Sequence, residues 1–141
     1  MIIQLVSLFL LPISVICLGT TQSAGVKGTL MCDNKPAKNV KVKLYDDDRG
    51  VDTDDLMAEG RTDENGHFEL RGYTDEFTTI DPKLNIYHKC GKLIPICDRK
   101  ITIYIDDKYV SKGKVPSRIF DAGTIQLSGK FKGETTDCFN S

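Results

Sequence analysis

Short segments in which every second side chain is apolar recur along the chain, and this feature most limits the folds open to it. In the stretch Val40–Tyr45, Val42 and Leu44 alternate with Lys41 and Lys43. A period of two is typical of a β-strand that buries one face, and no stretch shows a sustained helical period. Seven segments follow this pattern: Val26–Cys32, Val40–Tyr45, Leu56–Thr62, His67–Arg71, Leu84–Cys90, Ile101–Ile105 and Ile125–Leu127.

Turn residues separate these segments. The clearest turn is Asp63–Gly66, which ends in Asn-Gly, a pair suited to positive φ. A chain of 141 residues with 40% hydrophobic side chains is long and apolar enough for one domain with its own core. Seven short strands divided by Gly, Pro and Asp turns predict an all-β fold, an antiparallel seven-stranded β-sandwich.

The N-terminal segment is apolar, and no charged side chain occurs before Lys27. This pattern predicts a secretory signal peptide over residues 1–19, cut after Gly19, and a domain over residues 20–141. A membrane anchor is the alternative, but the apolar run is short and is broken by Pro12. We therefore expect a secreted protein, in the extracellular region or at the cell surface, with no transmembrane anchor. Two other cut positions fit the small residues that follow, after Ser23 and after Ala24.

Four cysteines remain once the predicted signal peptide is removed: Cys32, Cys90, Cys97 and Cys138. In a small secreted domain an even number of cysteines predicts a disulfide framework, here two bonds with three possible connectivities. If successive strands reverse direction, all four cysteines fall at the same end of the sandwich, where bonding is geometrically feasible. The loops over residues 46–55 and 106–119 then lie at the opposite end.

Charge is balanced overall and uneven along the chain. The formal net charge is −1, from 19 basic and 20 acidic side chains. A nucleic-acid-binding domain usually has a basic excess, so this balance argues against one.

Along the chain, however, the charges are separated. Residues 108–132 contain six cations and one acid, and residues 46–64 contain nine acids and two arginines. We predict a site for an anionic head group or a protein partner on Lys108, Lys112, Lys114 and Arg118. Mutual neutralisation with the acidic loop is the alternative.

The acidic loop is a second candidate site. Calcium takes several oxygen ligands, and the pattern offers Asp46, Asp48, Asp52 and Asp54. The EF-hand pattern is broken at Gly50, and a solvated loop is the simpler interpretation. Calcium is therefore the only cofactor that the sequence leaves open.

His88 and Cys90 form a His-x-Cys pair, and Cys97 follows seven residues later. Histidine and cysteine are common zinc ligands, so a zinc site is one interpretation. A disulfide together with a buried histidine is the alternative, and secretion favours oxidised cysteine. We therefore predict no metal at these residues.

Several motifs together resemble the nematode transthyretin-like family. The most distinctive is Leu84–Cys90, which holds the family's signature His88-Lys89-Cys90. The others are Gly28–Cys32, Val40–Tyr45, Thr62–Phe68 and Asp121–Leu127. The resemblance implies a secreted, disulfide-stapled, transthyretin-like β-sandwich. It does not imply one activity, because fold and function separate.

We predict a non-enzymatic binding protein that acts through loops on a rigid sandwich, with an extracellular or cell-surface protein or an anionic phospholipid as its partner. One family member bridges phosphatidylserine on dying cells to an engulfment receptor. Related transthyretin-fold enzymes hydrolyse 5-hydroxyisourate and end in Tyr-Arg-Gly-Ser, whereas this sequence ends in Asp137–Ser141. No Gly-x-Ser-x-Gly elbow or phosphate-binding loop is present either. The alternatives are a carrier of a small hydrophobic ligand and an extracellular structural protein without a specific ligand.

Overall fold

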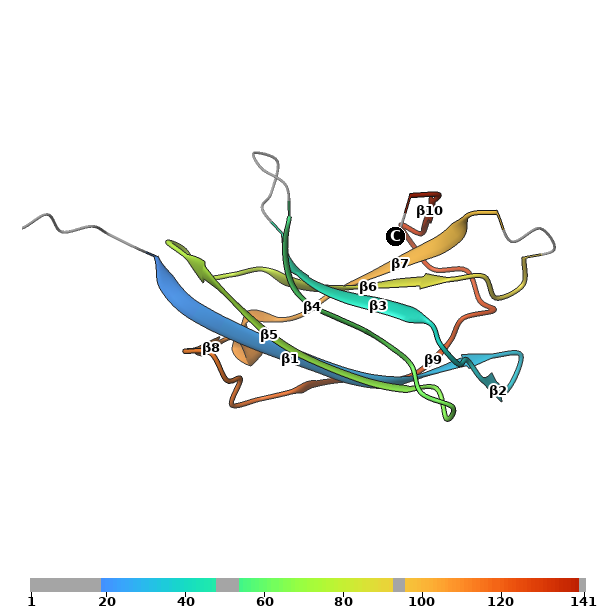
Figure 1. Ribbon diagram of the computed structural model, residues 1–141, viewed down its shortest axis with the longest axis horizontal. Helices are drawn as coiled ribbons and strands as arrows, with labels where there is room; N and C mark the ends of the chain where they lie inside the picture. The colour runs from blue at the N-terminus through green and yellow to red at the C-terminus, as the bar shows by residue number, and fades with distance from the viewer. Residues whose placement is uncertain (1–18, 48–53, 93–95, 140–141) are drawn as a thin grey trace, which may run out of the picture.

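Two β-sheets pack face to face in the computed structural model (Figure 1). The structure describes residues 19–47, 54–92 and 96–139. Almost all of the predicted signal peptide, together with Asp48 and Asp52 of the predicted calcium loop, lies outside these ranges. None of the described residues belongs to a helix with the length and hydrophobicity that a bilayer crossing requires.

The first sheet is built around a long strand, β1 (Thr20–Cys32), which all the other strands of the sheet contact. On one side β1 pairs antiparallel with β5 (His67–Glu76), and at its end with the short β2 (Lys35–Pro36). It also pairs antiparallel with the short β8 (Ser111–Lys112) and parallel with β9 (Phe120–Gln126).

The second sheet has the order β10-β7-β6-β3-β4, and all its pairs are antiparallel. A short 3₁₀ helix, η1 (Asp107–Tyr109), follows β7 and leads the chain to the first sheet. The strands of the second sheet are β3 (Lys41–Asp46), β4 (Asp55–Arg61), β6 (Pro82–His88), β7 (Asp98–Tyr104) and β10 (Thr135–Asp137).

The predicted disulfide-stapled sandwich is confirmed. Each of the seven predicted segments overlaps one of the seven long strands, and β2, β8 and β10 are two- or three-residue additions. Strand pairing differs from the prediction at one place, because β1 and β9 run parallel. The chain crosses from the second sheet to the first between β7 and β8, and β9 then runs in the same direction as β1. The first strand is also longer than predicted, since pairing with β5 starts at Thr20.

The core lies between the two sheets. Alternate side chains of both sheets point into it, as the period of two predicts. Its fully buried members include Val26, Leu30, Val42, Leu44, Leu84, Ile86 and Leu127.

Two glycines are required by local geometry. Gly66 has φ +78° in the predicted Asn-Gly turn, and a Cβ there would lie 2.3 Å from the carbonyl oxygen of Leu30. Gly25 lies under the side chain of Ile119, whose Cδ1 would be 2.4 Å from a Cβ at that position. The chain after β8 thus packs directly on the outer face of β1.

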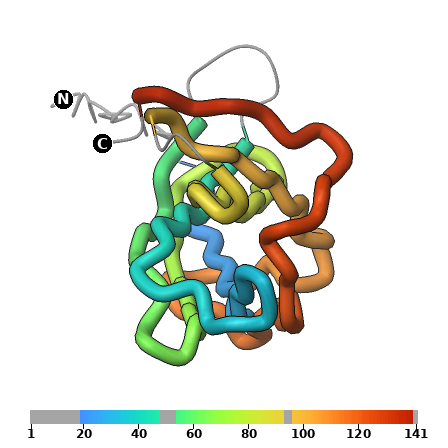
Figure 2. The backbone as a smooth tube through the Cα atoms, turned by 90° about the vertical axis from the view of Figure 1, so that its right-hand side faces the viewer, coloured from blue at the N-terminus to red at the C-terminus, as the bar shows by residue number. Residues whose placement is uncertain are grey.

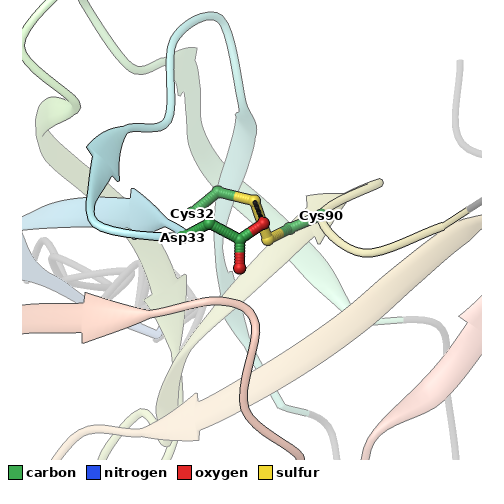
Figure 3. Close-up of side chains that lie close together, drawn as sticks. All are labelled: Cys32, Asp33 and Cys90. Carbon is green, nitrogen blue, oxygen red and sulfur yellow. Dashed lines mark hydrogen bonds between the residues drawn. A yellow bond between two sulfur atoms is a disulfide. The ribbon is translucent and has the colours of Figure 1, made fainter.

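Two disulfides close one end of the sandwich, which we call the disulfide end. Cys32 bonds to Cys90, which joins the end of β1 in the first sheet to the end of β6 in the second (Figure 3). Cys97 bonds to Cys138 and ties the C-terminal segment to the start of β7. Figure 2 looks at this end, where the C-terminal segment runs around one side of the sandwich.

Candidate functional site at the two ends of the sandwich

Three carboxylates from three strands meet at the other end of the sandwich, which we call the open end. Asp46 ends β3, Asp55 begins β4 and Glu76 ends β5, and one oxygen of each lies within 4.8 Å of those of the other two. Asp46 is only 3% exposed, and the other two are partly buried. We call these three residues the acidic cluster.

The strand pattern explains why the acidic cluster is buried. Asp46 follows Val42 and Leu44 at the same spacing of two, so its side chain points inward at the last residue of β3. Glu76 is in phase with Leu70 on β5 and points inward from the opposite sheet. The two carboxylates therefore face each other across the end of the core.

A short loop closes the open end over the acidic cluster. The Asp81 N–H donates to Oδ1 of Asp46 at 2.9 Å, and the Asp47 N–H donates to the Asp81 carbonyl at 2.9 Å. Gln22 of β1 anchors the same loop, since its Oε1 accepts from the Ile80 N–H and its Nε2 donates to the Thr78 carbonyl. These bonds fix the position of Asp46 within the fold.

Burial and neighbouring negative charge shape the titration of this end. Burial raises the pKa of Asp46, and Asp55 and Asp81 raise it further against the hydrogen bonds from Asp81 and Glu76. Lys83 forms ion pairs with Asp54 at 2.6 Å and Asp47 at 3.7 Å. Burial lowers the pKa of Lys83, but these ion pairs outweigh that effect and the net shift is upward.

The predicted calcium residues are placed only in part. The structure puts Asp46 and Asp54 at the open end, while Asp48 and Asp52 lie outside the described residues. Asp55 and Glu76 join Asp46 in the acidic cluster and were missed as ligands. Inward phase was the available clue for Asp46, but the approach of Glu76 depends on how the two sheets pack. Chemically, three carboxylates supply the oxygen ligands that calcium prefers.

The predicted basic residues Lys108, Lys112, Lys114 and Arg118 also lie at the open end, and all four are exposed. Arg118 donates to the Lys108 carbonyl at 3.5 Å, so these two residues are neighbours. The ammonium group of Lys114 lies 5.4 Å from the ring centroid of Tyr73, on the outer face of the first sheet. We call the four cations the basic segment.

Exposed apolar side chains accompany the basic segment. Phe77 is 76% exposed and Val115 is 71% exposed. Phe77 and Lys112 line the same hollow of about 300 Å³, and Val115 follows Lys114 directly in the chain. The open end therefore combines exposed cations with exposed apolar side chains.

The residues of the His-Lys-Cys signature serve different structural roles at the disulfide end. His88 is 3% exposed, and its Nδ1 accepts from the Cys90 N–H at 3.0 Å, while its buried Nε2 has no partner among the residues that the structure describes. Lys89 forms an ion pair with Asp98. Burial, aided by the positive charge of Arg99, lowers the pKa of His88 to about 4. His88 is therefore neutral at physiological pH.

Arg99 organises the C-terminal segment beside His88. Its guanidinium pairs with Glu134 and donates to the carbonyls of Cys90, Leu127 and Gly129. Arg99 thereby links β7 to the chain before β10.

The cysteine sulfur atoms that could have bound zinc are in disulfide bonds. Cys90 is bonded to Cys32, and Cys97 is bonded to Cys138. Figure 3 shows the carboxylate of Asp33 beside the Cys32–Cys90 bond, with its Oδ2 3.9 Å from the Cys32 sulfur. No thiolate remains on these four cysteines to ligate a metal.

Comparison with known proteins agrees with this architecture. The chain belongs to the Transthyretin-like family, whose sequence profile matches residues 27–106. It is 57% identical to Transthyretin-like protein 5 of Caenorhabditis elegans over 96% of this chain and 98% of the relative. Transthyretin-like protein 33 of the same nematode is 54% identical over 85% of this chain and 84% of its own length. Transthyretin-like protein 2 is 42% identical, over 87% and 86% of the two chains.

Family membership confirms the resemblance drawn from the sequence motifs. It suggests an extracellular protein of the binding type, since proteins of this family are in general non-enzymatic. Partner and site must be argued from the residues at the two ends.

Proposed function

We propose that this chain is a secreted, non-enzymatic domain that binds anionic phospholipid through the open end. The observation that carries the proposal is the basic segment, whose exposed cations include Lys112, which lines a hollow with exposed Phe77, and Lys114, which precedes exposed Val115 in the chain. Cations attract acidic lipid head groups, and apolar side chains gain free energy by entering the acyl boundary. Phosphatidylserine is the head group chosen for the test. A protein held at another surface at the same time would make the domain a bridge.

Calcium has a defined place in this proposal. The acidic cluster lies at the same end as the basic segment and would repel an anionic membrane. A calcium ion held by Asp46, Asp55 and Glu76 would remove that repulsion. We therefore propose that lipid binding strengthens when calcium is added.

Liposome sedimentation tests both statements. Vesicles of phosphatidylserine and of phosphatidylcholine are compared at low and high salt, with and without calcium. Selective, salt-sensitive binding to phosphatidylserine is expected. The double variant Lys112→Gln/Lys114→Gln should bind about 30-fold more weakly, because each cation near the surface contributes about 1 kcal/mol.

Lys130→Gln/Lys132→Gln is the matched control, since these two lysines are also exposed and lie in the C-terminal segment beyond β9. It should bind like the parent protein. Equal losses in the two double variants, or no binding under any condition, would contradict the lipid proposal. A ligand-dependent rise in melting temperature with a small apolar compound would then favour the carrier alternative.

A further inference from the structure

A row of cations crosses the outer face of the second sheet near its disulfide end. The strand register places Arg61 of β4 opposite Lys41 of β3, Lys41 opposite Tyr87 of β6, and Tyr87 opposite Lys100 of β7. Residues directly opposite each other share a face of a sheet. With strands about 4.8 Å apart, the row from Arg61 to Lys100 is about 14 Å long. We call these four residues the cationic row.

Like charges stand side by side in this row. Lys41 and Arg61 are direct cross-strand neighbours, an arrangement that destabilises a sheet. Among the described residues, Lys41 and Lys100 have no carboxylate partner, and Arg61 donates to a backbone carbonyl, that of Asn39. The next row differs, since Lys43 lies opposite Glu59. Lys41 and Lys100 therefore present positive charge that no carboxylate of the described residues pairs with.

A hollow of about 340 Å³ lies along the cationic row, since Arg61, Lys41 and Tyr87 help to line it. It is lined by four cations, Lys38, Lys41, Arg61 and Lys89, and by one acid, Asp98, which already pairs with Lys89. The surplus of positive charge fits one strongly acidic group of a ligand.

Rigid backbone holds these cations. Lys41, Arg61 and Lys100 sit on paired strands. At the edge of the hollow, the Thr62 hydroxyl accepts from the Val40 N–H at 2.9 Å and donates to the Ala37 carbonyl at 2.6 Å. Little ordering is needed when an anion arrives, which favours binding.

The surroundings of the row distinguish it from the lipid-binding end. None of the strongly exposed large apolar side chains of the described residues lies in the cationic row or lines its hollow. Tyr87, the one aromatic member, is 6% exposed. A row of charge without apolar side chains fits a linear polyanion in water better than a membrane surface.

We propose that the cationic row binds a linear sulfated polysaccharide, with one sulfate in the hollow and others along the row. Sulfate esters are strong acids, remain charged, and accept paired N–H bonds from arginine. Such polymers are extracellular, so the proposal takes the extracellular location, and nothing else, from the proposed function.

Heparin is the probe for this proposal. Lys41→Gln/Lys100→Gln removes two cations that have no carboxylate partner among the described residues, so the variant should remain folded. Heparin carries condensed counterions as nucleic acids do, and loss of two contacts should lower the salt slope of log Kd by about two. At low salt we expect roughly tenfold weaker binding.

Lys112→Gln/Lys114→Gln is the charge-matched control, and each double variant serves as control for the other ligand. The proposal requires that the Lys41 and Lys100 pair lose heparin binding and keep phosphatidylserine binding. It also requires that unsulfated hyaluronan bind at least tenfold more weakly than heparin. The proposal is overturned by equal heparin loss in both pairs, by unchanged heparin binding, or by loss of vesicle binding in the Lys41 and Lys100 pair. Failure of the lipid proposal alone would leave heparin binding intact.

Discussion

Strands β3 and β4 place like charges opposite each other at both ends of their pairing, and the surroundings of these charges differ between the two ends. At the open end Asp46 lies opposite Asp55, and at the disulfide end Lys41 lies opposite Arg61. Asp46 is buried and hydrogen-bonded by the loop that closes the core. Lys41 and Arg61 point outward on a sheet face. A net charge of −1 thus conceals a separation of charge along the strands.

The comparison also extends to what holds each end. A disulfide joins the two sheets at one end, whereas Gln22 and the Asp46–Asp81 contacts organise the other. The disulfide end also holds a buried nitrogen, Nε2 of His88, that has no hydrogen-bond partner among the described residues. The open end holds the buried carboxyl of Asp46, whose pKa is raised by burial. Chemical conditions should therefore act on the two ends in different ways.

The largest expected effect comes from opening the disulfide end. Cys32→Ala/Cys90→Ala frees a closed loop with a sequence separation of 58 residues. By the chain-entropy estimate this removes about 4 kcal/mol of stability. Thermal unfolding should show a fall in melting temperature of roughly 10–20 °C. A fall of less than about 3 °C would mean that packing alone holds this end together.

Acid should destabilise the disulfide end through His88. Its pKa falls from 6.5 in the unfolded chain to about 4 in the native state, so the unfolded state binds the extra proton between these values. Stability is therefore complete above pH 6.5 and declines as pH drops toward 4, by about 3 kcal/mol in all. The charges that act on the ring are those of Arg99, Glu134, Asp98 and Lys92.

Urea unfolding from pH 7 to pH 4 measures this effect. His88→Leu should flatten the decline, although it loses the acceptor for the Cys90 N–H. His67→Gln is the control, because His67 is exposed. If the parent and His88→Leu proteins show the same slope, titration of His88 does not control acid stability.

At the open end the free energy of unfolding should change with pH in the opposite direction. The pKa of Asp46 is raised in the native state, so its contribution is present at low pH and is lost as pH rises through that value. At pH 7 Asp46→Asn should therefore stabilise the protein, while its amide oxygen still accepts from the Asp81 N–H. The same change should abolish any calcium-dependent rise in melting temperature.

Asp63→Asn provides the contrast for this prediction. The pKa of Asp63 is lowered, chiefly because its carboxylate accepts from the His67 N–H, so this variant should lose stability at pH 7. Stabilisation by Asp46→Asn together with destabilisation by Asp63→Asn would support the argument. If both variants were less stable than the parent protein, the negative charge of Asp46 would be stabilised by its surroundings in the native state.

The smallest expected effect concerns the cationic row. Lys41→Glu replaces a like-charge pair with an opposite-charge pair opposite Arg61, which should add roughly 0.5 kcal/mol of stability. Denaturant unfolding at low salt is the measurement. A gain in stability accompanied by weaker heparin binding would show that Lys41 contributes to ligand binding and not to the stability of the fold. A loss of stability would show that Lys41 has a structural role.

The fold followed from local pattern, because alternation assigns each strand a buried face whatever its partners are. The parallel pairing of β1 with β9 did not follow, since it depends on where the chain after β7 crosses to the first sheet. The pairing of Cys32 with Cys90 was likewise open, because all four cysteines gather at one end and three pairings were feasible there.

The site was less predictable than the fold. Asp46 could have been placed inward from the phase of Val42 and Leu44, but the approach of Glu76 required the packing of two sheets. The cationic row required register. The connection between β3 and β4 is too long to fix their register by turn type, so Lys41 and Arg61 could not be matched from sequence alone.

The length of β1 has a consequence for geometry between binding partners. Thirteen extended residues, at about 3.3 Å each, give a span of about 40 Å from Thr20 to Cys32. A protein that holds a lipid head group beyond one end and a polysaccharide near the other would work as a spacer of fixed length. The distance between those two surfaces would then be set by the rise of a single strand.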